Sequence, residues 1–196
     1  MVLVNLRGYR KILKTVLNLP ICSMSEEIPG VIHGRLSSKG VTITDPSSVV
    51  ELEKRGYGER EGEKLYLKDY EALFLLYTGK LQITRKGRNV SLDDLAIVAS
   101  KQDPNAWTRF LIYRDLRSRG YVAKEGFGFG VDFRLYDRGE FGSKPAKYVV
   151  FGLNEGTKMV ISKLNTSIDQ ITRMGKEAII AVIERRGEVI YYRVSK

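Results

Sequence analysis

The spacing of apolar residues changes at Gly120, and this change is the strongest constraint on the fold of the chain. Before it, the segment NAWTRFLIYRDLRSRG places Trp107, Phe110, Leu111 and Leu116 on one side of a helix that Gly120 can end. After it, apolar residues alternate with polar ones, which is typical of strands. The predicted strands are YVAKEGF, VDFRLYD, KYVVFGL, KMVIS, EAIIAVIE and EVIYYRV. A fold made of helices alone is therefore excluded.

The second half of the chain also carries one predicted helix and one glycine-rich turn. LNTSIDQITRMGK predicts a helix whose buried stripe is Ile168, Ile171 and Met174. GFGFG, at Gly126–Gly130, lacks the spacing of a nucleotide-binding loop and joins strand to strand. We interpret it as a bulged or tight hairpin that needs glycine for positive φ.

The first half predicts a compact α+β unit. VIHGRLSSKGVTIT reads as two short strands around a turn, and KLYLKDYEALFLLYTGKLQI predicts strand, helix and strand, with the helix at Asp69–Tyr77. Between them, DPSSVVELEKRG predicts a helix with Asp45 as its N-cap, Pro46 at its first position and Gly56 after its end.

A second unit begins after this first one. Ser91 and Asp94 form a capping pattern that predicts the start of another helix, SLDDLAIVASKQ. We predict an α+β protein with an N-terminal extension at residues 1–30, a small α+β domain at 31–86 and a second domain at 87–196.

The charge of the chain favours a polyanionic partner. The formal net charge is +10, which indicates nucleic acid first and an anionic membrane second, with surplus surface lysine as the alternative. Few Asn and Gln beside abundant Glu, Lys and Arg are typical of a thermophile. Residues 1–24 are basic and partly amphipathic; we interpret them as an N-terminal helix or an extension upstream of a start at Met24.

The sequence contains few residues of the types that bind metals. Cys22 and His33 are the single cysteine and the single histidine, so a zinc site cannot be built, and no acidic cluster has metal-ligand spacing. We expect no metal and no cofactor. One cysteine permits no intrachain disulfide, which favours the cytoplasm, and no apolar run approaches a membrane span.

Arginines on the predicted helix at residues 105–120 could bind phosphate. The strip consists of Arg109, Arg114, Arg117 and Arg119, and a solvated helix face explains it equally well. The helix also follows another helix after a break at Pro104. A helix-turn-helix-like nucleic-acid binder is therefore one alternative, and plain helix packing is another.

The segment YRDLRSRGYVAKEGFGFGVDFRLYDRG, followed by KYVV, resembles the C-terminal catalytic domain of archaeal tRNA-splicing (tRNA-intron) endonucleases. The ending KEAIIAVIERRGEVIYYRV is similar to the last strands of that family, with its paired tyrosines at Tyr191 and Tyr192. The first unit matches in outline, so the resemblance covers Val31 to Val194. It implies a second domain of mixed sheet with flanking helices.

The resemblance implies metal-free RNA cleavage, in which a 2′-hydroxyl attacks the adjacent phosphate and leaves a 2′,3′-cyclic phosphate. In the family a tyrosine is the base, a histidine the acid and a lysine the stabiliser of the phosphorane. Tyr136 matches the tyrosine and Lys176 the lysine. Separately from the resemblance, we predict Arg114, Arg117 and Arg134 as RNA-binding residues.

The sequence departs from the family at the histidine. Pro145 and Ala146 stand in the loop just before KYVV, where the histidine is expected, and neither can donate a proton. Losing a general acid costs ~10²–10⁴ in rate. The family's RNA-binding arginine is also missing, since Asp169 and Gln170 occupy its region.

The departure suggests a structural subunit that assembles with a catalytic subunit, two copies of each, to bind precursor tRNA at its bulge-helix-bulge. The family pairs its final strand across a two-fold-like interface. The matching interface residues are Glu188, Val189, Ile190, Tyr191 and Tyr192. A family contact also docks an acidic loop in a basic pocket, and the matching loop LNEGT holds one acid, Glu155.

One alternative within the family stays open. The chain could be an active nuclease whose proton donor is Lys144 or water.

Overall fold

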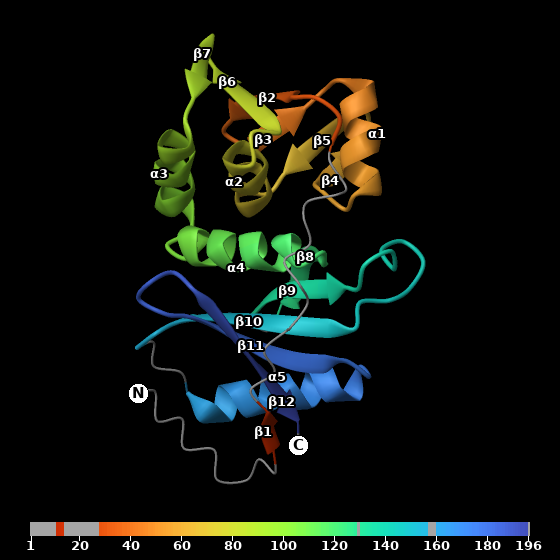
Figure 1. Cartoon of the computed structure of the whole chain (residues 1–196), viewed down its shortest axis with the longest axis vertical. Coiled ribbons are helices and arrows are strands. Elements are labelled where there is room, and N and C mark those ends of the chain that lie inside the picture. Colours follow the sequence, from red (N-terminus) through yellow and green to blue (C-terminus); the bar gives the residue numbers. More distant parts are fainter. Residues whose placement is uncertain (1–10, 14–27, 129, 157–159, 196) are drawn as a thin grey trace. The chain divides into compact units, whose positions relative to one another are not determined.

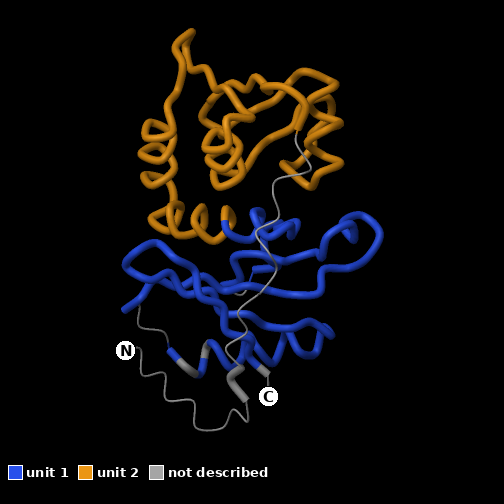
Figure 2. The backbone as a smooth tube through the Cα atoms, viewed as in Figure 1, with its two compact units in different colours: residues 1–22, 115–196 blue, residues 23–114 orange. Residues whose placement is uncertain are grey.

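A computed structural model shows the chain as two compact units, and it describes residues 11–13, 28–128, 130–156 and 160–195 (Figure 1). The N-terminal unit comprises residues 23–114, and the C-terminal unit comprises residues 115–196 with residues 1–22 (Figure 2). The division falls inside the helix α4 (Ala106–Ser118). This division separates compact units and does not test the predicted domain limits at residues 86 and 87. Those limits stay a prediction.

The described part of the N-terminal unit is a six-stranded sheet with helices. The strand order is β4-β5-β3-β2-β6-β7, in which β2 and β6 run parallel and the other neighbours antiparallel. The strands are β2 (Ile32–Ser37), β3 (Gly40–Ile43), β4 (Glu59–Glu61), β5 (Lys64–Leu67), β6 (Leu81–Arg85) and β7 (Arg88–Val90). The helices are α1 (Pro46–Lys54), α2 (Asp69–Tyr77) and α3 (Leu92–Gln102). This confirms the predicted α+β class of the first unit.

Capping residues place the helix starts as the sequence predicted. The Asp45 carboxylate accepts a hydrogen bond from the Ser48 amide at 2.8 Å, and Pro46 opens α1. Ser91 and Asp94 cap α3 reciprocally, since each side chain accepts a hydrogen bond from the other residue's amide. The short edge strands β4 and β7 were not predicted. Strand β4 consists of three charged residues, ERE, so it lacks the alternation of apolar and polar residues from which strands are predicted.

A buried carboxylate joins two segments of the N-terminal unit. Glu71 is 1% exposed, and its carboxylate accepts hydrogen bonds from the Gly58 amide at 3.0 Å and the Lys68 amide at 2.9 Å. Gly58 has φ +66°, and a Cβ there would lie 2.6 Å from Leu65. The turn before β4 is therefore held against α2 by a contact that admits only glycine.

We expect Glu71→Ala to lower the free energy of unfolding by about 2–3 kcal/mol, because it leaves two backbone amides without their charged acceptor. The measurement is urea denaturation of the full chain followed by circular dichroism. Glu63→Ala, at an exposed turn, is the control and should change stability little. Equal midpoints for the two variants would contradict the role given to Glu71.

The described part of the C-terminal unit is a six-stranded mixed sheet. Its order is β1-β12-β11-β10-β9-β8; β10 and β11 are parallel and the other neighbours antiparallel. The strands are β1 (Lys11–Leu13), β8 (Val122–Gly128), β9 (Val131–Tyr136), β10 (Tyr148–Asn154), β11 (Glu177–Ile183) and β12 (Val189–Ser195). The helix α5 (Ile161–Arg173) joins the two parallel strands. The predicted second fold of mixed sheet and flanking helices is confirmed.

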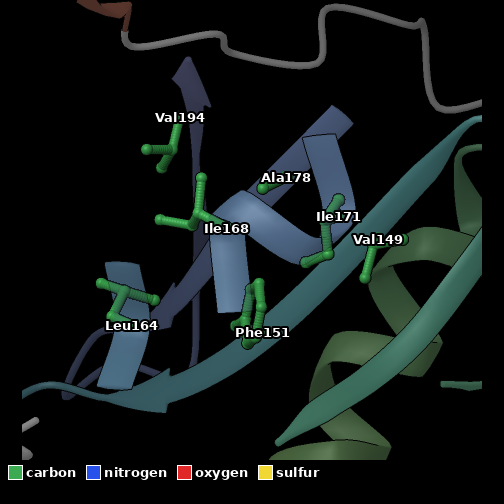
Figure 3. Packing of buried hydrophobic residues seen from close by; sticks show 7 residues of the cluster. All are labelled: Val149, Phe151, Leu164, Ile168, Ile171, Ala178 and Val194. Carbon is green, nitrogen blue, oxygen red and sulfur yellow. The ribbon is translucent and has the colours of Figure 1, made fainter. Parts of the chain in front are cut away.

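Helix α5 packs on the sheet through residues spaced at helical intervals. Leu164, Ile168 and Ile171 are at most 6% exposed and lie against Val149 and Phe151 of β10, with Ala178 and Val194 completing the cluster (Figure 3). This stripe fixes the face that α5 turns to the sheet, and so fixes where its C-terminal end arrives.

Four sequence predictions were wrong in detail. The segment KMVIS was predicted as a strand, but α5 already begins at Ile161. Its first two residues, Lys158 and Met159, lie outside the described part of the chain. Met174 is 47% exposed rather than buried, because it is the C-cap of α5. Trp107 is 45% exposed, and Tyr113 is buried instead.

The fourth correction concerns residues 1–24, of which the structure describes 11–13. These form the strand β1 rather than a helix, with Lys11 opposite Ser195 and Leu13 opposite Arg193. A strand forms there because the outer edge of β12 offers unpaired backbone groups.

Candidate nucleic-acid interface and candidate active site

The ends of three elements meet at one edge of the C-terminal sheet. Tyr148 pairs with Leu135 on one side and with Glu177 on the other. The Lys147 amide donates to the Leu135 carbonyl at 3.0 Å, and the Glu177 amide donates to the Lys147 carbonyl at 3.1 Å. The end of β9, the loop before β10 and the end of α5 therefore lie side by side.

Lys176 reaches the loop in which the family histidine is expected. Its ammonium group donates a hydrogen bond to the Ala146 carbonyl oxygen at 2.6 Å. Ala146 is 4% exposed, whereas Pro145 is exposed. The structure thus brings together Lys176 and the Pro145–Ala146 position, which are far apart in sequence, at the strand end where Tyr136 stands.

Two cations flank one exposed ring beside this edge. The Arg134 guanidinium lies 5.1 Å and the Lys176 ammonium 5.6 Å from the ring centroid of Phe127, which is 38% exposed. Among the described residues, the buried Nε of Arg134 has no hydrogen-bond partner. Two positive charges and a ring suit a phosphate with an adjacent base.

Phe127 was missed by the sequence reading. It belongs to GFGFG, whose interpretation as a bulged hairpin is confirmed: the register between β8 and β9 shifts between Glu125 and Gly128. A Cβ on Gly126 would lie 2.4 Å from the Val131 carbonyl oxygen, so the hairpin needs glycine there. The one available signal was an aromatic residue between glycines, which a turn alone does not require.

Tyr136 is the last residue of β9 and is partly buried. Its ring packs edge-on against Phe141, with centroids 5.1 Å apart. In the following loop, the Lys144 ammonium forms an ion pair with Glu140. This ion pair lies within the loop itself, between residues four positions apart. Asp169 and Gln170 are partly buried on α5, where a phosphate-binding site would favour a cation.

The arginine strip does not form one free surface. Arg109 forms an ion pair with Asp103 at 3.6 Å, Arg114 lies over the Tyr77 ring, and Arg119 pairs with Asp115 at 2.6 Å. Arg117 is partly buried. In addition, the consecutive residues Leu111, Ile112 and Tyr113 of α4 are all buried. A helix buried on more than one side gives the helix-turn-helix alternative no support.

A buried network ties the start of the C-terminal unit to β12. The Tyr191 hydroxyl donates to the Asp115 carboxylate at 2.7 Å, and the Arg119 guanidinium donates to the same carboxylate oxygen at 2.6 Å. Burial first, and then the negative charge of Asp115, raise the pKa of Tyr191 well above its ordinary value of 10.0. Tyr191 is 3% exposed, so this member of the predicted interface set serves the core of its own unit.

We expect Tyr191→Phe to lower the free energy of unfolding by about 1–2 kcal/mol at neutral pH. The folded chain holds the Tyr191 proton at pH values where the unfolded chain loses it, so this residue's contribution falls as pH rises above about 10. Urea midpoints measured across pH 7–11 should therefore converge between the wild type and the variant. Tyr192→Phe, at the neighbouring, partly buried position, is the control; a gap of constant size would contradict the assignment.

The other predicted interface residues lie in β12 or directly before it. Glu188, which precedes the strand, is exposed, and Val189, Ile190 and Tyr192 are partly buried. One edge of β12 pairs with β11, and β1 covers the other edge only from Arg193 to Ser195. His33, the single histidine, lies in the other compact unit, on β2.

Comparison with known proteins identifies the family of the chain. Residues 32–96 match the family model for the N-terminal domain of tRNA intron endonuclease, and residues 106–191 match the model for its catalytic C-terminal domain. The chain belongs to the tRNA intron endonuclease family.

Archaeal relatives agree with this assignment. The chain is 32% identical over 164 residues to a tRNA-splicing endonuclease of Methanococcus vannielii, covering 83% of this chain and 93% of the relative. It is 31% identical over 140 residues to a tRNA-splicing endonuclease of Pyrococcus furiosus, covering 71% of this chain and 81% of the relative. Within the described part of the chain, no helix has the length and apolar character needed to cross a membrane.

Proposed function

We propose that this chain is the structural subunit of a heteromeric tRNA-intron endonuclease. In this role it assembles with a catalytic subunit and helps to hold precursor tRNA at its bulge-helix-bulge. The observation that carries the proposal is the loop before β10: Pro145 and Ala146 occupy it, and the Ala146 carbonyl accepts a hydrogen bond from Lys176.

The position at which the family histidine is expected offers no group that can protonate a leaving oxygen. Proline and alanine carry no ionisable hydrogen, and Lys144 is held by Glu140. A missing general acid lowers a rate by ~10²–10⁴. Tyr136 and Lys176 remain at the strand ends, yet the Lys176 ammonium already has an oxygen partner, as a lysine kept for packing would.

Binding of RNA does not need the missing acid. Arg134, Lys176 and the Phe127 ring form a cationic, partly apolar surface at the same edge. Such surfaces hold phosphates and unpaired bases without chemistry. A subunit that contributes this surface to a shared substrate has a reason to keep it after losing catalysis.

The loop LNEGT fits a chain that receives a partner's acidic loop. The Glu155 carboxylate accepts a hydrogen bond from the Arg185 amide at 3.3 Å and lies 3.8 Å from the Arg185 guanidinium. Its one acid is thus engaged within its own chain. For assembly we propose the part of β12 that β1 does not pair with in the described part of the chain, with Val189, Ile190 and Tyr192, and the preceding Glu188 as the edge that meets the partner.

The test is cleavage of an intron-containing precursor tRNA. The purified chain alone should not cut it, and adding the chain to a histidine-bearing relative from the same genome should raise the cleavage rate above that of the relative alone. A Tyr136→Phe variant should assist equally well, because this residue acts here without chemistry. Cleavage by the chain alone that disappears in Tyr136→Phe would overturn the proposal.

A proton donor can be returned to the loop. Because Pro145 is exposed and Ala146 is buried, only Pro145 leaves room for an imidazole. We expect Pro145→His to raise the single-turnover rate by at least roughly tenfold over Pro145→Ala, below the full contribution of a tuned acid.

The product should end in a 2′,3′-cyclic phosphate, and adding Tyr136→Phe should remove the gain. If folded Pro145→His and Pro145→Ala variants are equally inactive, the loop is not the lost acid position.

A further inference from the structure

The outward face of the N-terminal sheet is a second charged surface, remote in sequence from the edge described above. Along β2 the core side holds Ile32 and Leu36, while His33, Arg35 and Ser37 are exposed. The face is hollowed: side chains of β2, β5 and β6, with residues of the β2–β3 hairpin and the end of β3, line a depression of about 440 Å³.

The lining of this depression carries positive charge only. It includes Arg35, Lys39 and Lys64, and no Asp or Glu is among its lining residues. Within the described part of the chain, none of these three cations forms an ion pair. The edge strand β4 carries two acids: Glu61 lies opposite Lys64, and Glu59 lies opposite Tyr66 and 3.5 Å from Lys68. They bound the face on that side and leave its centre cationic.

Strand register aligns side chains of β6, β2, β3 and β5 in one row across the face, and Asn89 of β7 and Glu59 of β4 extend the row at its two ends. Thr84 pairs with Arg35, Arg35 with Thr42, and Thr42 with Tyr66. Paired residues of neighbouring strands share a face and lie about 5 Å apart, so Arg35 and the partly buried Tyr66 are separated by about 10 Å. A nucleotide spans such a distance, with its phosphate on the arginine and its base on the ring.

We infer that this face binds single-stranded RNA. Cations for phosphates, hydroxyls for sugar and phosphate oxygens, and a ring for stacking are the groups that unpaired RNA requires together. An acidic peptide would use the cations but not the ring. The inference builds on the proposed function, since it adds a contact for the same precursor on the other compact unit.

The test uses the full chain and a fluorescein-labelled 12-nucleotide uridine RNA, followed by fluorescence anisotropy at several salt concentrations. Arg35→Gln, Lys64→Gln should weaken binding and lower the slope of log K against log salt by about 1.4, because two phosphate contacts are lost. Tyr66→Ala should weaken binding roughly 5- to 150-fold, and Tyr66→Phe should not.

The matched control is Lys54→Gln, Lys101→Gln, which removes the same charge from the exposed ends of α1 and α3. Urea midpoints confirm that all variants remain folded. If the face variant and the control bind equally, the inference is wrong.

Photo-crosslinking with 4-thiouridine RNA gives a second readout. Crosslinks should fall in peptides containing β2 and β5; crosslinks confined to residues 115–195 would overturn the inference. Loss of a co-purifying acidic protein from the face variant, with RNA binding unchanged, would assign the face to a peptide instead. The uridine RNA carries no splice element, so these outcomes do not depend on the cleavage assay of the proposed function.

Discussion

The parallel pairing of β10 with β11 is the constraint on which the rest of the C-terminal unit depends. Parallel neighbours start at the same edge of a sheet and need a crossover between them, and α5 supplies it. The stripe Leu164, Ile168 and Ile171 locks that crossover onto the sheet. Lys176, one residue before β11, must therefore arrive beside Ala146, two residues before β10, although 30 positions separate them.

At this edge of the sheet, the groups that could bind RNA and the group that would donate a proton depend on different parts of the fold. The cations Arg134 and Lys176 depend on strand and helix positions that the fold maintains for its own stability, and both lie against Phe127. A proton donor depends on one side chain in a loop, which can be replaced without disturbing the sheet. A chain of this fold can therefore lack an acid in this loop and still present a surface that attracts phosphate.

The positive charge of the chain is also distributed unevenly. Several arginines of α4 are used internally: Arg109 pairs with Asp103, and Arg119 joins the buried network of Asp115 and Tyr191. The cations of the N-terminal sheet face have no such partners within the described residues, and its lining holds no acid. The net charge alone thus indicates a polyanionic partner. The ion pairs of individual side chains indicate where on the chain such a partner can bind.

Local signals in the sequence determined most of the secondary structure, the helix caps and the family. Asp45 and Ser91 mark helix starts through hydrogen bonds to their own neighbours, and Pro46 does so through its fixed φ. Alternation along β9 agrees with the burial of Phe133 and Leu135. The motif around Tyr136 likewise carried the family resemblance, which the family matches support.

Only the tertiary structure decided the rest: that Lys176 meets Ala146, that Tyr191 is buried on Asp115, that Lys11–Leu13 pairs with β12, and that Arg35 and Tyr66 share a row. Each of these is a contact between segments far apart in the chain, set by strand register and by competition for an open edge, and neither leaves a periodic trace in the sequence.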